Sequence, residues 1–313
     1  MKWEDERQSD NVDDLRGDGG GGGGGGGLGG LGGLLGLLPL LGLRGGIGVL
    51  VVIALVVFGG PLLGRLGGGG SAPPSAQSGP GFQGQPPEGA SRTAPAANDV
   101  DMRFVRAVAA YTEDTWTQVF KENGRTYTAP RIEIYSQGHQ TGCGLGQTAM
   151  GPFYCPRDRK VWLDLAFFQE LSGRFGAPGR FAEAYVIAHE VGHHVQTLLG
   201  TTAKVDAQRA EMSRAEFNPL SVRVELQADC YAGVWAAITN RSKAFIEPGD
   251  IEGGLRAASA VGDDTLQQES QGRVSPDSFT HGSSAQRMRW FRSGYDGASL
   301  DSCDTFSPAY SSL

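Results

Sequence analysis

The 313-residue sequence contains no run rich in lysine or arginine, and its formal net charge is -7. Binding to a phosphate backbone requires clustered positive charge, so this absence excludes nucleic acid as a partner. Cysteine is scarce as well, and the four cysteines form no CxxC pair, which argues against a zinc site built from cysteines. Glycine is abundant, but much of it lies in the first seventy residues. The two parts of the chain therefore need separate interpretation.

The first hundred residues divide into three segments. Residues 1–44 form an acidic and then Gly/Leu-rich leader that is too repetitive to specify a packed core. Residues 45–65 are uncharged up to Arg65 and have about the length of a membrane-spanning helix. A buried core helix is the alternative, but the low-complexity surroundings favour a transmembrane signal-anchor. Residues 66–98, rich in Gly, Pro, Ser and Ala, predict a flexible linker.

Basic residues are distributed unevenly around the predicted span. Lys2, Arg7, Arg16 and Arg44 precede it, whereas no lysine or arginine lies between Arg65 and Arg92. Orientation follows this bias, so the N-terminus is predicted to be cytoplasmic and the remainder of the chain extracytoplasmic. A cleaved signal peptide is the alternative and gives the same location for the remainder. The sequence thus predicts a single-pass membrane protein that contacts the lipid bilayer through its span.

Residues 99–313 have the composition of a globular domain. Two segments alternate like half-buried strands, residues 131–135 and 160–165. Apolar residues at helical spacing predict helices at residues 99–123, 166–171, 181–199, 219–240, 251–261 and 285–295. The predicted fold is α+β and mainly helical, with a short antiparallel-type sheet, preceded by a single transmembrane helix.

The strongest motif lies in the helix predicted at residues 181–199, where His189, Glu190 and His193 form the pattern HExxH. Residues four apart share a helix face, so two imidazoles can bind one Zn²⁺ while Glu190 stands beside the open position as general base. The composition gives roughly 0.01 chance matches to this pattern. The motif therefore predicts a zinc centre. His194 points about 100° away and is expected to pack or hydrogen bond.

A third protein ligand is expected on the next apolar helix, predicted at residues 219–240. Asn218 and Pro219 have the form of a helix cap and a first helical residue. Glu225 and Asp229 lie four residues apart on one face of that helix. One can bind zinc while the other accepts the free N–H of a zinc-bound histidine. The spacing leaves these two roles exchangeable.

Several segments together resemble the neutral zinc metallopeptidase family of bacteria. They are AHEVGHHVQ, RVELQADCYAGVW and, at residues 151–168, GPFYCPRDRKVWLDLAFF. The resemblance extends over nearly the whole chain and implies a zincin-like metallopeptidase domain anchored in the bacterial inner membrane. The pattern from Glu225 to Asp229 is similar to that of the prenyl-protein and heat-shock membrane proteases, in which the glutamate binds zinc. The resemblance thus implies Glu225 as the third zinc ligand.

A further motif, SFTHGSSAQRMRWF, resembles the Thr-His-Pro segment and the following arginine of those membrane proteases. Thr280, His281 and Arg287 match it, although Gly282 replaces the proline. A tetrahedral intermediate on zinc needs a donor opposite the metal. We therefore expect His281 to be catalytic and Arg287 to stabilise the transition state. The alternative is that His281 belongs to a surface loop.

The four cysteines lie in the predicted domain. If the domain is exported, Cys143 and Cys155 are expected to close the loop between the two predicted strands. Cys230 then pairs with Cys303 and ties the C-terminal tail to the helix that carries Glu225.

The predicted function is that of a membrane-anchored, zinc-dependent endopeptidase with one zinc ion per chain. Its partners are a peptide or protein substrate and the bilayer. In the predicted mechanism, zinc activates a water molecule and Glu190 takes the proton as the water attacks the peptide carbonyl. A non-catalytic zinc-binding envelope domain with a structural role is one alternative. A structural envelope protein without metal is the other.

Overall fold

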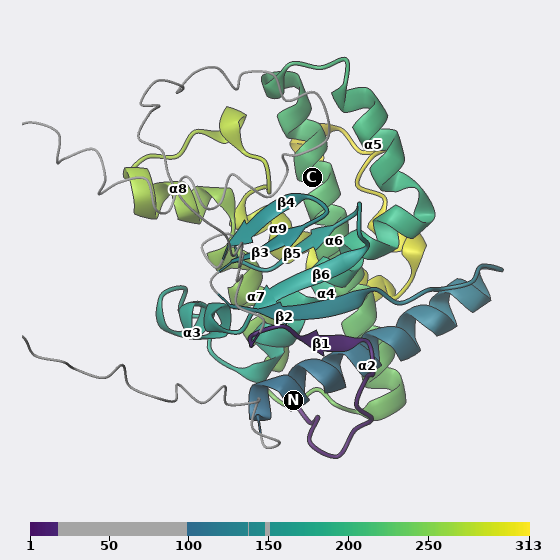
Figure 1. Ribbon diagram of the computed structural model, residues 1–313. Coiled ribbons are helices and arrows are strands. Elements are labelled where there is room, and N and C mark those ends of the chain that lie inside the picture. Colours follow the sequence, from purple (N-terminus) through teal and green to yellow (C-terminus); the bar gives the residue numbers. More distant parts are fainter. Residues whose placement is uncertain (18–98, 137, 148–150) are drawn as a thin grey trace, which may run out of the picture.

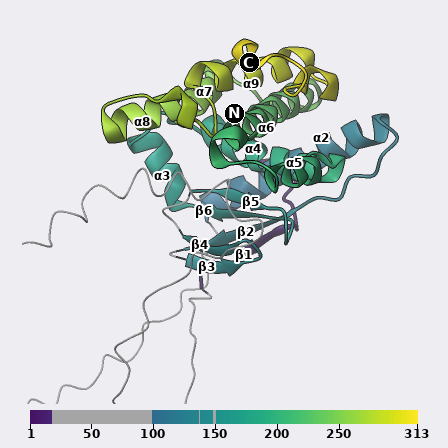
Figure 2. The ribbon, with the colours of Figure 1, turned by 90° about the horizontal axis from the view of Figure 1, so that it is seen from above.

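The computed structural model describes four parts of the chain, residues 1–17, 99–136, 138–147 and 151–313. Most of the predicted leader, the predicted span and the predicted linker lie outside these parts. Within them, no helix combines the length and the apolar character needed to cross a membrane. The described fold is α+β and mainly helical, as predicted. Its helices form a layer on one face of a small sheet (Figures 1 and 2).

The main sheet has four strands in the order β1 (Val12–Asp14), β2 (Arg131–Tyr135), β6 (Lys160–Asp164) and β5 (Phe153–Cys155). The β1–β2 and β2–β6 pairs are parallel, and only the β5–β6 pair is antiparallel. The predicted antiparallel-type sheet is therefore wrong for the two strands recognised in the sequence. The chain leaves β2, forms further strands, and then enters β6 in the same direction.

Two further strands follow β2 in the sequence and precede β5. They are β3 (Gly138–Thr141) and β4 (Gly144–Gln147), which pair as a separate antiparallel hairpin. The predicted disulfide between Cys143 and Cys155 is present, with a Cα–Cα distance of 5.8 Å. This bond ties the hairpin to β5. Four buried side chains pack together on the strands beside it, namely Tyr135, Phe153, Cys155 and Trp162.

Eight α-helices are described: α2 (Val100–Glu122), α3 (Ala166–Gly173), α4 (Arg180–Leu199), α5 (Thr201–Arg209), α6 (Arg214–Lys243), α7 (Asp250–Ala260), α8 (Asp263–Gln271) and α9 (Ser284–Gly297). Helix α6 packs against both α4 and α9. The α6–α9 approach requires glycine, because a Cβ atom on Gly294 would lie 1.9 Å from the carbonyl oxygen of Cys230. The second predicted disulfide, between Cys230 and Cys303, lies beside this contact, with a Cα–Cα distance of 5.5 Å.

Helix α6 begins earlier than the sequence pattern predicts. Asn218 is not its cap: the helix starts after Ser213, whose side chain accepts from the Glu216 N–H while the Glu216 side chain accepts from the Ser213 N–H. This capping box stabilises the helix end. Pro219 therefore lies in the second turn, where its ring removes one backbone hydrogen bond. The capping box upstream of Pro219 is the stronger start signal, and the helix continues past the proline.

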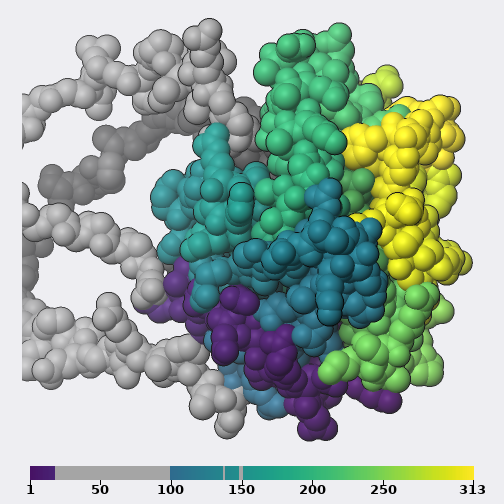
Figure 3. All heavy atoms as spheres, turned by 90° about the vertical axis from the view of Figure 1, so that its right-hand side faces the viewer, coloured from purple at the N-terminus to yellow at the C-terminus, as the bar shows by residue number. Residues whose placement is uncertain are grey.

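Residues 1–17 belong to the folded domain, which corrects the prediction of a separate leader over residues 1–44. Val12–Asp14 pair with Ile132–Ile134 in the main sheet. Trp3 is buried in the core and contacts Phe104 of α2, with ring centroids 5.4 Å apart. Figure 3 shows the N-terminal residues, in purple, packed against the rest of the domain. The contacts join residues about a hundred positions apart, so local sequence bias gave no sign of them.

Candidate metal centre

Helices α4 and α6 pack together and place three metal-binding side chains side by side. His189 and His193 lie one turn apart on α4, and their ring centroids are 4.8 Å apart. Glu225 faces them from α6. The three side chains each offer one ligand atom, and these atoms all lie within 4.8 Å of one another. The predicted ligand set is thus brought together by the fold.

The spacing of the histidine and glutamate atoms suits a bound zinc ion. The Nε2 atoms of His189 and His193 lie 3.3 and 3.6 Å from the two Glu225 carboxylate oxygens. A tetrahedral ion with bonds of about 2.0–2.1 Å holds its ligand atoms about 3.4 Å apart. His193 Nε2 and Glu225 Oε1 are buried and have no hydrogen-bond partner. Unpaired buried polar atoms are costly, and a metal ion would satisfy both.

The charges of the cluster also favour a cation. Burial raises the pKa of the Glu225 carboxyl, but His193 and His189 outweigh burial and hold that pKa well below its ordinary value. For His189, burial lowers the pKa because it disfavours the charged ring. The carboxylates of Asp229 and Glu225 outweigh burial and raise the pKa of His189 to about 10. A metal ion that binds at neutral pH therefore has to displace a proton from this site.

Each histidine is oriented by a hydrogen bond at its other ring nitrogen. His189 Nδ1 lies 2.8 Å from Asp229 Oδ1, which is the supporting position predicted for Asp229. His193 Nδ1 lies 2.9 Å from Gln196 Oε1. The Gln196 amide donates in turn to the Val224 carbonyl oxygen of α6 at 2.7 Å. These contacts turn both Nε2 atoms toward Glu225, as ligation requires.

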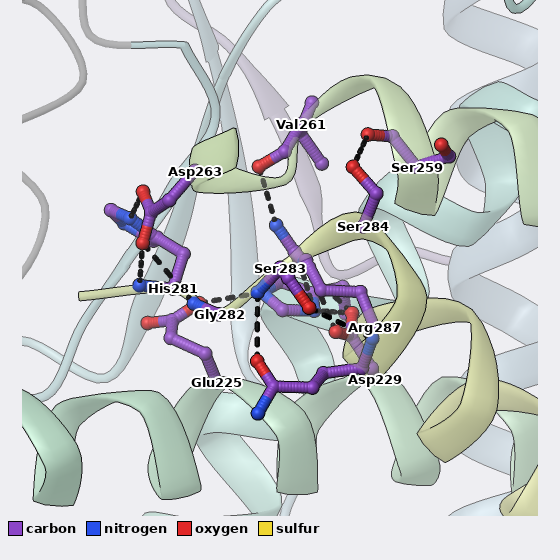
Figure 4. A network of polar contacts seen from close by, with 12 residues as sticks. Glu225, Asp229, Ser259, Val261, Asp263, His281, Gly282, Ser283, Ser284 and Arg287 are labelled. Carbon is purple, nitrogen blue, oxygen red and sulfur yellow. Dashed lines mark hydrogen bonds and ion pairs between the residues drawn. The ribbon is translucent and has the colours of Figure 1, made fainter. Parts of the chain in front are cut away.

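Arg287 does not face the metal site directly. It binds Asp229, the carboxylate that contacts His189 Nδ1. Its Nε and Nη2 atoms donate to the two Asp229 oxygens at 2.8 and 2.9 Å (Figure 4). A third donor, Nη1, bonds to the Val261 carbonyl oxygen at 3.1 Å. Tyr185 completes the group by donating its hydroxyl to Asp229 Oδ1 at 2.5 Å. This placement gives no support to the predicted transition-state contact by Arg287, whose guanidinium is committed to Asp229.

Glu190 is buried next to its two histidine neighbours. Its Oε2 atom has no hydrogen-bond partner among the described residues, and the backbone N–H of Tyr154 in β5 is near enough to favour its charged form. Burial raises the pKa of the Glu190 carboxyl above its ordinary value, although His189 and His193 oppose the shift. A raised pKa and a free oxygen suit a group that takes and returns a proton.

His281 is buried, with 2% of its surface exposed, so it is not a surface-loop histidine. Its Nδ1 atom lies 3.1 Å from Asp263 Oδ1, and its Nε2 atom has no partner. Figure 4 shows His281 near Glu225, whose carboxylate helps Asp263 to raise the pKa of the ring against the effect of burial. His281 is nonetheless not among the three residues whose ligand atoms meet there.

The two other histidines of the described domain have structural contacts, as expected for His194. Its Nε2–H donates to the Thr128 carbonyl oxygen at 2.7 Å, and Nδ1 accepts from the Tyr154 hydroxyl at 3.0 Å. Burial lowers the pKa of His194 to about 4, which keeps the ring neutral. His139 stacks on Trp162, with ring centroids 5.0 Å apart.

Three residues of the site were not recognised in the sequence: Tyr185, Gln196 and Asp263. The first two lie on the HExxH helix, four residues before His189 and three after His193, and so share a helix face with them. Polar groups at those spacings in an otherwise apolar helix were a usable signal. Asp263 gave none, because it contacts His281 from a separate helix.

The chain matches the family described as "Putative neutral zinc metallopeptidase" over residues 1–306. One relative, "Uncharacterized protein YpfJ" of Escherichia coli strain K12, is 44% identical over 308 residues, which cover 98% of this chain and 99% of the relative. Another, "Uncharacterized protein Rv2575" of Mycobacterium tuberculosis, is 45% identical over 217 residues, which cover 66% and 72% of the two chains. No solved structure matches the chain. The family match spans nearly the full length and includes all three clustered ligands, so the chain belongs to the neutral zinc metallopeptidase family.

Proposed function

We propose that this protein is a zinc-dependent endopeptidase. The observation that carries the proposal is the position of Glu190, with a free buried oxygen beside a complete His189, His193 and Glu225 ligand set. A structural zinc site uses four protein ligands, whereas a catalytic site uses three and leaves one position open. Three ligands next to a candidate general base support catalysis.

Zinc, when bound, lowers the pKa of a water molecule and polarises the peptide carbonyl. The remaining steps fall to the side chains of the chain itself. Glu190 takes the proton as the water attacks the carbonyl carbon and then gives it to the leaving amine. The buried Oε2 atom of Glu190 has no hydrogen-bond partner among the described residues, so it is available for this transfer. Asp229 and Gln196 keep the two histidines turned toward the metal.

An extended peptide is the substrate conformation that the sheet supports. Strand β5 lies at one end of the main sheet and pairs there with β6. The strand packs against α4, the helix that carries the proposed general base. An extended peptide that pairs with the outer side of β5 would be held by main-chain hydrogen bonds, which allow broad sequence preference.

We further propose that the domain acts outside the cytoplasm of a bacterial cell and contacts the membrane through residues 45–65. The two disulfides support an oxidising compartment, because such bonds persist there and are rare in the cytosol. The uncharged length of the segment supports the membrane contact.

Metal removal tests the proposed function. Protein purified from unsupplemented medium is expected to contain one zinc ion per chain and to cleave a denatured protein or a peptide library. Dialysis against a chelator should abolish cleavage, and added Zn²⁺ should restore it, because the ligands remain in place. Metal analysis and mass spectrometry of the products measure the two effects. Stoichiometric zinc without cleavage would instead favour a non-catalytic zinc-binding envelope domain.

A further inference from the structure

The side chain of Asp263, at the start of α8, accepts hydrogen bonds from the turn that carries His281. Its Oδ2 atom accepts from the backbone N–H groups of Thr280, His281 and Gly282 at 2.7, 2.6 and 3.2 Å (Figure 4). Its other oxygen, Oδ1, lies 3.1 Å from His281 Nδ1. One carboxylate therefore fixes both the backbone of the turn and one nitrogen of the ring.

The sequence of the turn is adapted to this arrangement. Gly282 follows His281 in the turn, and its φ angle is 91°. Proline is restricted to φ near -65° and has no N–H, so it could neither adopt this conformation nor donate to Asp263. Glycine makes the third backbone hydrogen bond available.

The contact with Asp263 leaves the second ring nitrogen free. A carboxylate only accepts, so His281 Nδ1 carries the hydrogen of that bond, and the Thr280 hydroxyl oxygen, 3.0 Å from the same nitrogen, can accept it as well. His281 Nε2 is buried and has no hydrogen-bond partner among the described residues, on a ring that Figure 4 shows near Glu225. When the ring is protonated, Nε2 donates. A fixed donor near the metal suits the oxygen that becomes negative when a peptide carbonyl is attacked.

We infer that Asp263 is a positioning residue that holds His281 with Nε2 directed at the reacting carbonyl oxygen of a bound peptide. The inference rests on the proposed peptidase function. It assigns Asp263 a part in turnover that is separate from metal binding, because Asp263 bonds to His281 and to backbone but to none of the three metal ligands among the described residues.

The variant Asp263→Asn tests this role. Asparagine keeps an oxygen for the backbone N–H groups but cannot offer the ring a second carboxylate oxygen. We expect kcat to fall about 10–100-fold, with KM and bound zinc unchanged, as for other groups that orient a functional histidine. The matched control is Asp264→Asn, the same change one residue along, where the acid bonds to Ser284 instead. A loss of kcat no larger than in the control would overturn the inference.

Two further measurements separate this role from a structural one and from the peptidase proposal. In a His281→Gln background, the additional change Asp263→Asn should lower kcat little further, because both residues act through one ring. Losses of kcat that multiply in the double variant would contradict the inference. Nitrogen-15 NMR of the histidines in metal-free protein should show hydrogen on His281 Nδ1 in wild type. A bare Nδ1 would refute the contact whether or not the protein cleaves peptides.

A second inference rests on different residues and concerns the membrane. Strand β1 pairs with β2, and Arg16 binds both Asp14 and Asp99, at 2.6 and 2.7 Å. Arg16 and Asp99, close to the two ends of the segment that lies outside the described residues, are therefore in contact with each other. Two strands of one sheet cannot lie on opposite sides of a bilayer.

We infer that residues 1–17 lie on the same side of the membrane as the metal centre. This replaces the single crossing with a cytoplasmic N-terminus that the charge bias predicts. The bias compares only the residues around the apolar segment, whereas the strand pairing involves residues more than a hundred positions apart.

Cysteine labelling of the full-length protein tests this arrangement. Asp10→Cys and Lys121→Cys place single thiols at exposed positions of the two segments. A membrane-impermeant maleimide applied to spheroplasts should label both variants before lysis or both only after lysis. The wild-type chain gives the background, since its four cysteines are disulfide-bonded. Labelling of one variant before lysis and of the other only afterwards would overturn the inference.

Discussion

Glu190→Gln is expected to abolish peptide cleavage while leaving zinc in place. Glutamine has nearly the same shape as glutamate, and Glu190 is not one of the three clustered ligands, so the helix and the ligands should be undisturbed. Its amide cannot take a proton from water. Removing a positioned general base typically costs about 10²–10⁴-fold in rate, and we expect kcat to fall within or beyond that range. Zinc content should equal that of the wild type.

The control for this variant is Glu183→Gln on the same helix. Glu183 lies two turns earlier and pairs with Arg180 instead of facing the metal ligands. It undergoes the same chemical change with no expected loss of kcat. Full activity in the Glu190 variant would refute the proposed mechanism, and loss of zinc would show that Glu190 acts on the metal site instead.

Arg287→Met is expected to destabilise the protein by about 3–5 kcal/mol, the usual cost of leaving one charge of a buried ion pair without its partner. Asp229 is fully buried and takes two hydrogen bonds from the guanidinium. Although burial opposes it, Arg287 and His189 lower the pKa of Asp229 to about 2. Without the arginine this carboxylate must either stay charged and unpaired or take up a proton.

Urea unfolding of the metal-free protein measures this effect, because bound metal adds stability of its own. The control is Arg292→Met, an exposed arginine of the same helix. A double variant of Arg287→Met with Asp229→Asn should be less destabilised than the sum of the two single changes, since it removes the unpaired charge. A loss below about 1 kcal/mol, as is usual for surface pairs, would contradict the assigned position of Arg287.

The helices and strands of the domain were predictable where their signals are local. The helices near residues 100–122, 180–199 and 250–260 follow from apolar spacing within one segment. The start of α6 was misplaced because a capping box at Ser213 outweighs the proline signal at Pro219. Strand β1 was missed because three polar-flanked residues become a strand only when β2 offers them a partner.

In the metal centre too, local spacing predicted some contacts and tertiary packing decided the others. The sequence alone determined the pair His189 and His193 with Glu190 between them, because the periodicity of one helix dictates that they share a face. It narrowed the third ligand to Glu225 or Asp229, and the packing of α4 on α6 gives Glu225 the ligand position. Only the tertiary structure decided that Arg287 supports Asp229 and that Asp263 holds His281. These contacts join segments that are separate in the sequence, and spacing along one element carries no information about which surfaces will pack together.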